Sequence, residues 1–432
     1  MKIVHLVPGS GGSFYCQNCV RDGILIRALR QRGHDVVLVP LYLPLFDNAP
    51  EETDQQAPVF YGALNIYLSQ KLPFAAHLPS VVRHFLNSAP MLRAAARLAG
   101  VTRSAGLEDL TLSMLKGEEG RQAFELDQLV DWLSTTECPD AVHFSNALLL
   151  GMAPRIRAAL GARLVCSLQD EDVWLGPMPA AARRKAIDLL REHARQIDAF
   201  VAPSHYYART AGNLFKIPAE QIRVIPPGLQ LEAYQCGESP TPPVLGFLSR
   251  LSAASGLEAL VNAFIELRQD TELQDLRLHL CGGTTGDDRP FVKRQFARLR
   301  RAGVMDGVRV FEKLDLASRC SFLQGLSVLS VPCPAGEAFG LQIAEAMACG
   351  VPCVQPNVGA YPELIKSEVN GILYEFPSKN ALTEALRRLL RDSHLRHRMG
   401  ANARKDACER FNPNKYADAI LRLYTQTTHK DS

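Results

Sequence analysis

Two glutamates eight residues apart, Glu337 and Glu345, stand in a segment that is otherwise built of small and apolar residues, GEAFGLQIAEAMACG. The apolar pattern over residues 341–348 predicts a buried helix. At roughly 100° per residue, two side chains with this separation on one helix would point only about 80° apart. We therefore expect Glu337 in the loop before the helix and Glu345 one turn inside it.

This arrangement would place exposed backbone amides at Phe339, Gly340 and Leu341 between the two carboxylates. Helix N-terminal amides bind anions, and carboxylates accept hydrogen bonds from hydroxyl groups. The pattern favours a ligand with phosphates in its middle and hydroxyl groups at both ends, which is the layout of a sugar nucleotide. The alternative is that both glutamates face solvent and bind nothing.

Length and composition indicate an ordinary globular chain of two or three domains, with 432 residues that are 47% hydrophobic and 22% charged. The 48 basic and 45 acidic residues nearly cancel, so no global field points to nucleic acid. No apolar run reaches the roughly 18 residues that span a bilayer, and residues 2–7 are too short for a signal-peptide core, so we expect a cytoplasmic protein. The 11 cysteines stand mostly in apolar contexts and are expected to be reduced core residues.

Apolar strands alternate with helical patterns along most of the chain. Such alternation predicts doubly wound α/β domains, whose ligands bind beyond the carboxyl ends of the strands. The first half has predicted strands at 2–7, 33–42, 141–146, 162–168, 199–204 and 223–228, and predicted helices up to residue 32, at 147–160 and at 181–196. The second half has predicted strands near 244–249, 276–281, 307–311, 327–332 and 352–355.

A proline-rich stretch at 238–244 separates the two halves. We therefore expect an N-terminal Rossmann-like domain over residues 1–237, with an atypical insertion at about 45–125, and a second Rossmann-like domain over residues 238–405. The final helical pattern, within residues 406–432, is expected to pack across the domains.

The segment GEAFGLQIAEAMACGVPCVQPNVGAYPELI resembles the glutamate, seven residues, glutamate signature of the family-4 retaining glycosyltransferases, which have the GT-B fold. The similarity extends to GFLSRLSAASGLEALVNAF, to RVIPPGL, to NGILYEF and to the Gly11-Gly12 loop, and it covers most of the chain outside the insertion. The resemblance implies two Rossmann-like domains that face a central cleft. It also implies transfer of a hexose, with retention and without a metal or cofactor, from a nucleoside diphosphate sugar to an unidentified acceptor.

By the same resemblance, Glu337 lies beside the donor sugar and Glu345 binds the nucleotide ribose. The amides at 339–341, together with the Gly11-Gly12 loop, would hold the diphosphate. Arg250 matches the family's phosphate-binding arginine, and a guanidinium is a natural bidentate partner of phosphate oxygens. The alternative for Arg250 is a surface arginine at a strand end.

One departure concerns the leaving group, because Ser255 stands where the family usually has a lysine before a glycine. Losing one such contact typically costs on the order of a hundred- to a thousandfold in rate. Arg21 and Lys313 are candidates to replace the missing cation. The departure also motivates a second hypothesis, a catalytically weakened sugar-nucleotide-binding scaffold or partner subunit.

A second departure lies in the N-terminal half. Relatives often carry two histidines with one residue between them at a strand end, and here only the first, His143, is present. It is either a catalytic residue at the cleft or a structural histidine. Gln169 likewise stands where relatives often have histidine, and the acidic cluster at 170–172 that follows it either binds acceptor hydroxyls or lies in a solvated loop.

Two further features remain open. Cys16 and Cys19 form a lone C-x-x-C, for which zinc binding and redox chemistry compete with simple packing under the glycine loop. The insertion at 45–125 contains apolar clusters with interspersed arginines. It is expected to cover the acceptor side of the cleft, or to form a basic amphipathic surface that meets an anionic membrane.

Overall fold

The computed structural model describes residues 1–8, 14–41, 107–378 and 380–426. It divides into two compact units. The first consists of residues 1–11, 22–225 and 416–432, and the second of residues 12–21 and 226–415. The chain therefore passes into the second unit and back at residues 12–21, enters it again at residue 226 and returns to the first unit at residue 416. Two of these divisions fall within helices, namely α1 (Gln17–Arg30) and α18 (Pro413–Thr425).

The first unit is built on a parallel six-stranded sheet with strand order β2-β1-β3-β4-β5-β6. Its order reverses between β1 and β3, which makes this the switch point of a doubly wound sheet. The strands are β1 (Lys2–Val7), β2 (Asp35–Pro40), β3 (Ala141–Phe144), β4 (Arg163–Ser167), β5 (Ala199–Ala202) and β6 (Ile222–Val224). The first five lie within segments predicted from their apolar pattern, and β6 overlaps its predicted segment but begins one residue earlier.

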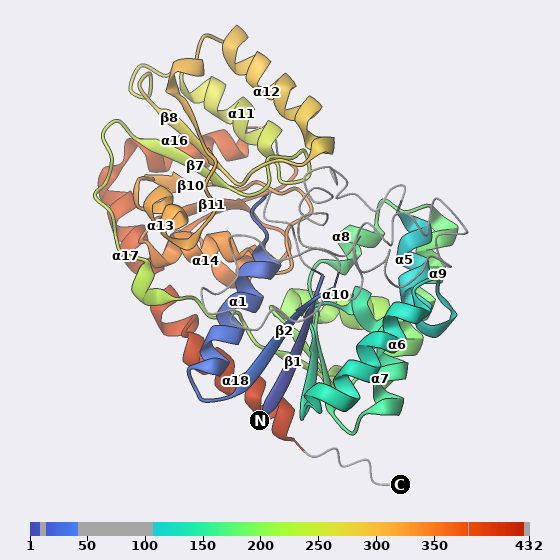
Figure 1. Ribbon diagram of the computed structural model, residues 1–432. Helices are drawn as coiled ribbons and strands as arrows, with labels where there is room; N and C mark the ends of the chain where they lie inside the picture. Colours follow the sequence, from blue (N-terminus) through green and yellow to red (C-terminus); the bar gives the residue numbers. More distant parts are fainter. Residues whose placement is uncertain (9–13, 42–106, 379, 427–432) are drawn as a thin grey trace. The chain divides into compact units, whose positions relative to one another are not determined.

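Helices α1 and α18 supply the helical residues of one core cluster on this sheet. The helices other than α1 that accompany the sheet are seen in Figure 1. They are α5 (Glu108–Leu115), α6 (Ala123–Trp132), α7 (Ala153–Ala159), α8 (Glu171–Leu175), α9 (Ala180–His193), α10 (His205–Phe215) and α18 (Pro413–Thr425). Ile420 and Leu423 of α18 are buried with the strand residues Ile3 and Val165. The C-terminal segment thus supplies part of the core of the first unit.

The second unit also contains a parallel six-stranded sheet, with strand order β12-β11-β10-β7-β8-β9 and its switch point between β7 and β10. The strands are β7 (Val244–Leu248), β8 (Arg277–Cys281), β9 (Val308–Phe311), β10 (Val328–Leu329), β11 (Cys353–Pro356) and β12 (Gly371–Tyr374). The first five match predicted strands, whereas β12 comes from NGILYEF, to which no strand was assigned.

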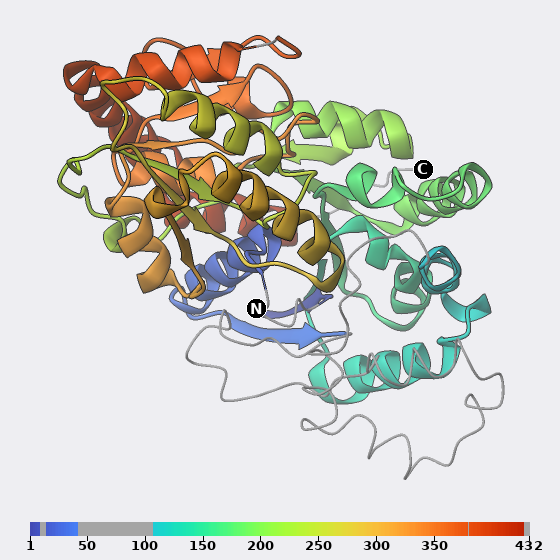
Figure 2. The ribbon, with the colours of Figure 1, turned by 90° about the horizontal axis from the view of Figure 1, so that it is seen from above.

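Helices cover both faces of this second sheet (Figures 1 and 2). They are α11 (Leu257–Leu267), α12 (Arg289–Arg301), α13 (Leu316–Gln324), α14 (Leu341–Ala348), α15 (Tyr361–Leu364), α16 (Ala381–Arg391) and α17 (Ser393–Arg410). One core joins α11, α12 and α16 to the sheet through leucines and aromatic residues, including Phe247, Phe264 and Leu386.

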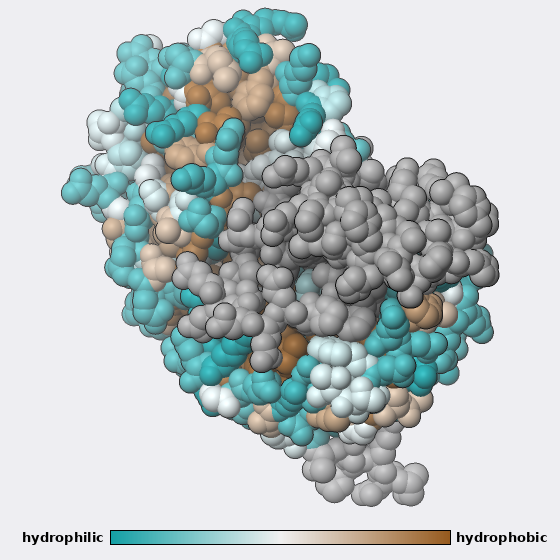
Figure 3. Space-filling view, in the orientation of Figure 1, coloured by the Kyte–Doolittle hydropathy of each residue, from teal (hydrophilic) through white to brown (hydrophobic). Residues whose placement is uncertain are grey.

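The predicted fold class, α/β with two Rossmann-like doubly wound units, is confirmed. The face of the second unit seen in Figure 3 is mostly hydrophilic, with smaller apolar areas among the polar side chains. Within the part of the chain that the structure describes, no helix is both long enough and apolar enough to cross a bilayer.

Candidate functional site

The two glutamates lie where their spacing predicted, at the start of α14 in the second unit. Glu337 stands in the loop that precedes the helix, and Glu345 is the fifth residue of α14. The loop needs glycine twice, because Gly336 has φ +73° and Gly340 has φ +93°. A Cβ on Gly336 would also lie 2.6 Å from the Cα of Gly359. At the start of α14, a Cβ on Gly340 would lie 3.4 Å from Glu337 Oε2, so the Glu337 side chain lies beside the beginning of the helix.

Glu345 is completely buried, and three side chains bind its carboxylate. The Tyr15 hydroxyl donates to Oε2 over 2.6 Å, and the Tyr234 hydroxyl donates to Oε1 over 2.5 Å. Arg319 Nε, on α13, donates to Oε1 over 3.1 Å. All four residues belong to the second unit, so they form one buried polar network.

The charge of this network is concentrated on Glu345 and Arg319. Burial alone would lower the pKa of Arg319, but its attraction to Glu345 outweighs burial and holds the pKa above its usual value. Burial, reinforced by the neighbouring Glu345, raises the pKa of Tyr15 and of Tyr234. Both tyrosines therefore remain neutral hydrogen-bond donors across the physiological pH range.

Glu337 is partly buried and is held by two amide side chains. Gln342 Nε2 donates to its Oε2 over 2.7 Å, and Gln17 Nε2 donates to its Oε1 over 3.2 Å. Desolvation raises the pKa of the Glu337 carboxyl in spite of these hydrogen bonds. Among the described residues, Gln342 Oε1 has no hydrogen-bond partner, so an unused acceptor lies beside Glu337.

The backbone amides at the start of α14 differ in their surroundings. The N–H of Leu341 donates to Gln17 Oε1 over 2.8 Å, which leaves this predicted phosphate-binding amide engaged by the protein itself. The Phe339 side chain is buried and packs edge-on against Phe411, with ring centroids 5.7 Å apart. Phe339 and Gly340 could therefore contribute main-chain groups to a ligand, but the Phe339 ring supports the core.

Arg250 follows β7 at the switch point of the second sheet, the position where such sheets bind ligands. Its Nε lies 3.4 Å from Oδ2 of the buried Asp288, which also accepts a 2.7 Å hydrogen bond from Thr285. The guanidinium carbon lies 5.9 Å from the centre of the Phe14 ring. The structure thus fixes Arg250 through a carboxylate rather than leaving it as a surface arginine at a strand end.

Ser255 lies in the turn between β7 and α11, and its neighbour Gly256 has φ +80°. The hydroxyls of Ser252 and Ser255 lie 2.8 Å apart, and the Ser255 amide donates to Ser252 Oγ over 3.2 Å. A Cβ at Gly256 would lie 2.0 Å from the Pro332 carbonyl oxygen, so the turn packs tightly on the segment after β10. The proposed substitutes for the missing lysine differ in burial, since Arg21 is buried and Lys313 is exposed.

In the first unit, His143 is fully buried in β3 and both of its ring nitrogens are engaged. Nδ1 lies 2.5 Å from the Tyr424 hydroxyl, and Nε2 lies 2.9 Å from Ser167 Oγ. Its ring also packs against His5, with centroids 4.6 Å apart. Of the two interpretations of His143, this geometry favours the structural one.

In the acidic cluster at 170–172, Asp170 and Asp172 are partly exposed, whereas Glu171 is buried. Its oxygens accept hydrogen bonds from the amides of Ala147 and Gln169 over 2.8 and 2.9 Å, and from the Tyr207 hydroxyl over 2.7 Å. Burial raises the pKa of Glu171. Glu171 therefore joins three segments of the first unit, and Gln169 adds a hydrogen bond to the Ser145 carbonyl.

The structure shows few contacts that bear on the remaining predictions, which concern the C-x-x-C pair, the glycine loop and the insertion. The Cys19 amide donates to Cys16 Sγ over 3.4 Å, and the two cysteines do not form a disulfide. In the described ranges, no group of three or more histidine, cysteine or acidic side chains is placed to hold a metal ion. Gly11 and Gly12 lie outside the described residues, as do the apolar clusters and arginines within 45–106.

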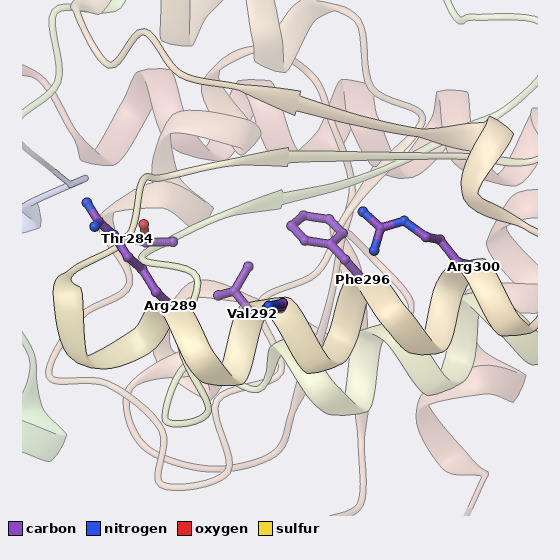
Figure 4. A pocket seen from close by; sticks show the side chains of 6 residues that line it. Thr284, Arg289, Val292, Phe296 and Arg300 are labelled. Atoms are coloured by element: carbon purple, nitrogen blue, oxygen red, sulfur yellow. The ribbon is translucent and has the colours of Figure 1, made fainter.

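A surface hollow of about 250 Å³ lies along α12 (Figure 4). Thr284 and Arg289 lie at one end of it, and Phe296 and Arg300 lie at the other. Its basic side chains are spaced along one helix face and are separated by apolar ones. The Glu337 and Glu345 network does not contribute to this hollow.

Sequence reasoning missed the side chains that complete the donor-side network, namely Tyr15, Gln17, Tyr234, Asp288, Arg319 and Gln342. Tyr15 and Gln17 are separated by more than 300 residues from the glutamates they contact, so no local pattern connects them. Arg319 carried a usable signal, because an arginine within a helix of mostly small and apolar residues, LASRCSFLQ, needs a buried anion.

Curated relatives include the D-inositol 3-phosphate glycosyltransferase of Xylanimonas cellulosilytica, 30% identical over 54% of this chain and 58% of the relative. Another is the N-acetyl-alpha-D-glucosaminyl L-malate synthase of Bacillus anthracis, 26% identical over 62% of this chain and 69% of the relative. The chain spans about half the length of most of the curated relatives it matches.

Solved structures show the same fold over nearly the whole chain. The Anabaena protein HepE, in a complex with UDP and glucose, matches with a TM-score of 0.68 and 19% identity over 98% of both chains. Sucrose-phosphate synthase of Thermosynechococcus elongatus matches with a TM-score of 0.72 and 18% identity, again over 98% of both chains. Both are GT-B proteins.

Two family models together account for most of the sequence. Residues 23–228 match the glycosyl transferase 4-like domain, and residues 234–406 match glycosyl transferases group 1. The second match contains both glutamates, Arg250 and Ser255, and the two matches meet where the described units change near residue 226. The chain therefore belongs to the group 1, family-4-like glycosyltransferases with the GT-B fold.

Proposed function

We propose that this protein transfers a hexose from a nucleoside diphosphate sugar to an acceptor hydroxyl, with retention of configuration and without a metal ion. One observation carries the proposal. A guanidinium, a helix N-terminal amide and two carboxylates of the second unit all contact the short segment Phe14–Gln17, and these are the group types that bind a diphosphate and hydroxyl groups.

Each group has a role in this proposal. Arg250 and the Leu341 amide face the diphosphate, because a guanidinium and a helix N-terminus both favour phosphate oxygens. Glu337 accepts hydrogen bonds from the transferred sugar, and the unused Gln342 Oε1 beside it provides a second acceptor. Glu345 accepts one from the ribose. Arg319 Nε lies 3.1 Å from Glu345 Oε1 and fixes the position of this carboxylate.

Retention without a dedicated base follows if the reaction takes place on one face of the sugar. The leaving phosphate oxygen then removes the proton of the attacking hydroxyl while the bond to the anomeric carbon breaks. The protein has to stabilise the developing phosphate charge, which is the contribution of Arg250 and the amide. Because these groups supply the positive charge, activity should survive a chelator.

A second candidate, a sugar-nucleotide-binding scaffold with weakened catalysis, is favoured by one observation. Ser255 offers only a neutral hydroxyl, which lies 2.8 Å from the hydroxyl of Ser252, at the position where relatives have a lysine. Such a protein would bind the donor but turn it over slowly or not at all.

The test uses UDP-glucose, because HepE has been solved with this compound. Binding is measured by calorimetry, and release of UDP is measured with a panel of acceptor alcohols and with EDTA present. Binding together with acceptor-dependent UDP release supports the transferase. Binding with no turnover under any condition supports the scaffold, and loss of activity with EDTA contradicts the metal-independent mechanism.

A further inference from the structure

The segment Phe14–Gln17 contacts Arg250, the Leu341 amide and both glutamates, to which we assign roles toward the donor. These four residues belong to the same compact unit as Arg250, Glu337 and Glu345. We propose that this segment, called the plug below, occupies the donor site of the empty protein and has to leave before a nucleoside diphosphate sugar binds. The inference rests on the proposed function and adds a regulatory step to it.

Tyr15 takes the place of a ribose hydroxyl. Its own hydroxyl donates to Glu345 Oε2 over 2.6 Å, and its side chain is only 5% exposed. The other oxygen, Oε1, is held by Tyr234 and Arg319. A ribose that reaches Glu345 therefore competes with Tyr15 for Oε2, because Oε1 already accepts two hydrogen bonds and the buried Tyr15 covers the other oxygen.

Gln17 takes the place of a phosphate oxygen and a sugar hydroxyl together. Its Oε1 accepts the Leu341 N–H over 2.8 Å, as a phosphate oxygen would at the start of α14. Its Nε2 donates to Glu337 over 3.2 Å, as a sugar hydroxyl would. One amide side chain thus satisfies both the predicted diphosphate contact and the predicted sugar contact.

The backbone of the plug is docked on the loop after β8. The Tyr15 N–H donates to the Gly282 carbonyl over 2.8 Å, and Phe14 forms an isolated antiparallel bridge with Gly283. The Phe14 ring also lies 5.9 Å from the Arg250 guanidinium carbon. A single bridge and a few side-chain hydrogen bonds hold the plug, so a ligand that offers phosphate charge to Arg250 and Leu341 can displace it.

With competition of this kind, the apparent Kd for the donor equals the intrinsic Kd divided by the fraction of molecules in which the plug is out of the site. If the plug occupies the site in roughly 90–99% of empty molecules, removing its contacts should tighten donor binding about ten- to a hundredfold. The sign is distinctive, because residues that belong to a donor site weaken binding when they are removed.

The first experiment compares the Kd of UDP and of UDP-glucose for the wild type and for the variant Tyr15→Phe/Gln17→Ala. Tyr207→Phe is the matched control, since it removes the hydroxyl of a similarly buried tyrosine bonded to a glutamate, in the first unit. We expect the double variant to bind both ligands about tenfold more tightly or better, and the control to bind as the wild type does. Unchanged or weaker binding by the double variant overturns the plug.

The second experiment needs no variant and follows hydrogen exchange of the wild type with and without saturating UDP-glucose. We expect the peptide that contains the Tyr15 amide to exchange faster in the complex, because its bond to Gly282 breaks when the plug leaves. A peptide over 341–348 should be protected or unchanged. Greater protection of the Tyr15 peptide in the complex overturns the proposal.

The two proposals fail in different ways. A wild type that binds UDP-glucose while neither the variant nor the exchange pattern behaves as expected leaves the proposed function in place and removes the plug. If neither the wild type nor the double variant binds UDP or UDP-glucose, the donor site itself is wrong and the plug falls with it. Binding by the double variant alone supports both.

Discussion

Replacing Arg319 by methionine removes the only cation that faces Glu345 within the part of the second unit that is described. Their atoms lie 3.1 Å apart, and the two side chains are 3% and 0% exposed. At an effective dielectric constant near 20, such a pair attracts with about 5 kcal/mol. Breaking a buried pair by removing one partner typically costs about 3–5 kcal/mol, because the remaining charge stays desolvated. We expect Arg319→Met to lose about 4 kcal/mol of unfolding free energy.

For a unit of about 200 residues, this loss corresponds to a fall of roughly 8–16 °C in Tm. Urea unfolding followed by circular dichroism measures the loss of unfolding free energy, and thermal unfolding measures the fall in Tm. Arg388→Met is the matched control, because Arg388 pairs with Glu368 over 2.7 Å in the same unit but both side chains are about half exposed. The control should change stability by less than about 1 kcal/mol.

The double variant Arg319→Met/Glu345→Gln removes both charges and should regain part of the lost stability. Two results would refute the reasoning that Arg319 compensates the buried Glu345. One is a loss of unfolding free energy below about 1 kcal/mol in Arg319→Met. The other is a double variant that is clearly less stable than Arg319→Met, as two independent losses would make it.

Three further predictions concern the donor site. Glu337→Ala should lower kcat for UDP-glucose about a hundredfold or more while binding of UDP alone changes little, as initial rates and calorimetry will show. Since desolvation raises the pKa of Glu337, its charge is lost on acidification before the usual value of 4.5 is reached, so kcat/KM should fall with falling pH in that range. A pH–rate profile of Glu337→Gln that keeps the same acid limb contradicts this assignment. Ser255→Lys should raise or maintain turnover if the site lacks one cation, and should lower donor affinity at low salt if another cation is already there. No change at either salt concentration means that residue 255 does not face the diphosphate.

Much of the fold could be predicted because parallel strands in doubly wound units read as short apolar runs, and five of the six strands of the second unit were found in this way. The positions of Glu337 and Glu345 were also predictable, since a buried helix of small and apolar residues leaves few places for a carboxylate. β12 was missed because a four-residue strand at a sheet edge carries little periodic signal.

The partners of the site could not be predicted from local pattern. Tyr15 and Gln17 reach the glutamates from the other end of the chain, and Asp288 reaches Arg250 from the segment before α12. Sequence similarity supplied the expected roles of Glu345 and Arg250. It did not predict the side chains that bind these two residues in the structure. Tertiary contacts of this range depend on the packing of the whole unit.

The assignment of function to the second unit is tested most directly by calorimetric titration of UDP-glucose into the wild type and into Arg250→Gln. A charge-assisted hydrogen bond from a guanidinium contributes about 1.5–3 kcal/mol, so the variant should bind about ten- to a hundredfold more weakly. Arg388→Gln, remote from these groups on α16, should bind as the wild type does. Binding of equal strength in the wild type and in Arg250→Gln, or no binding in either, would contradict the donor site proposed at the start of α14.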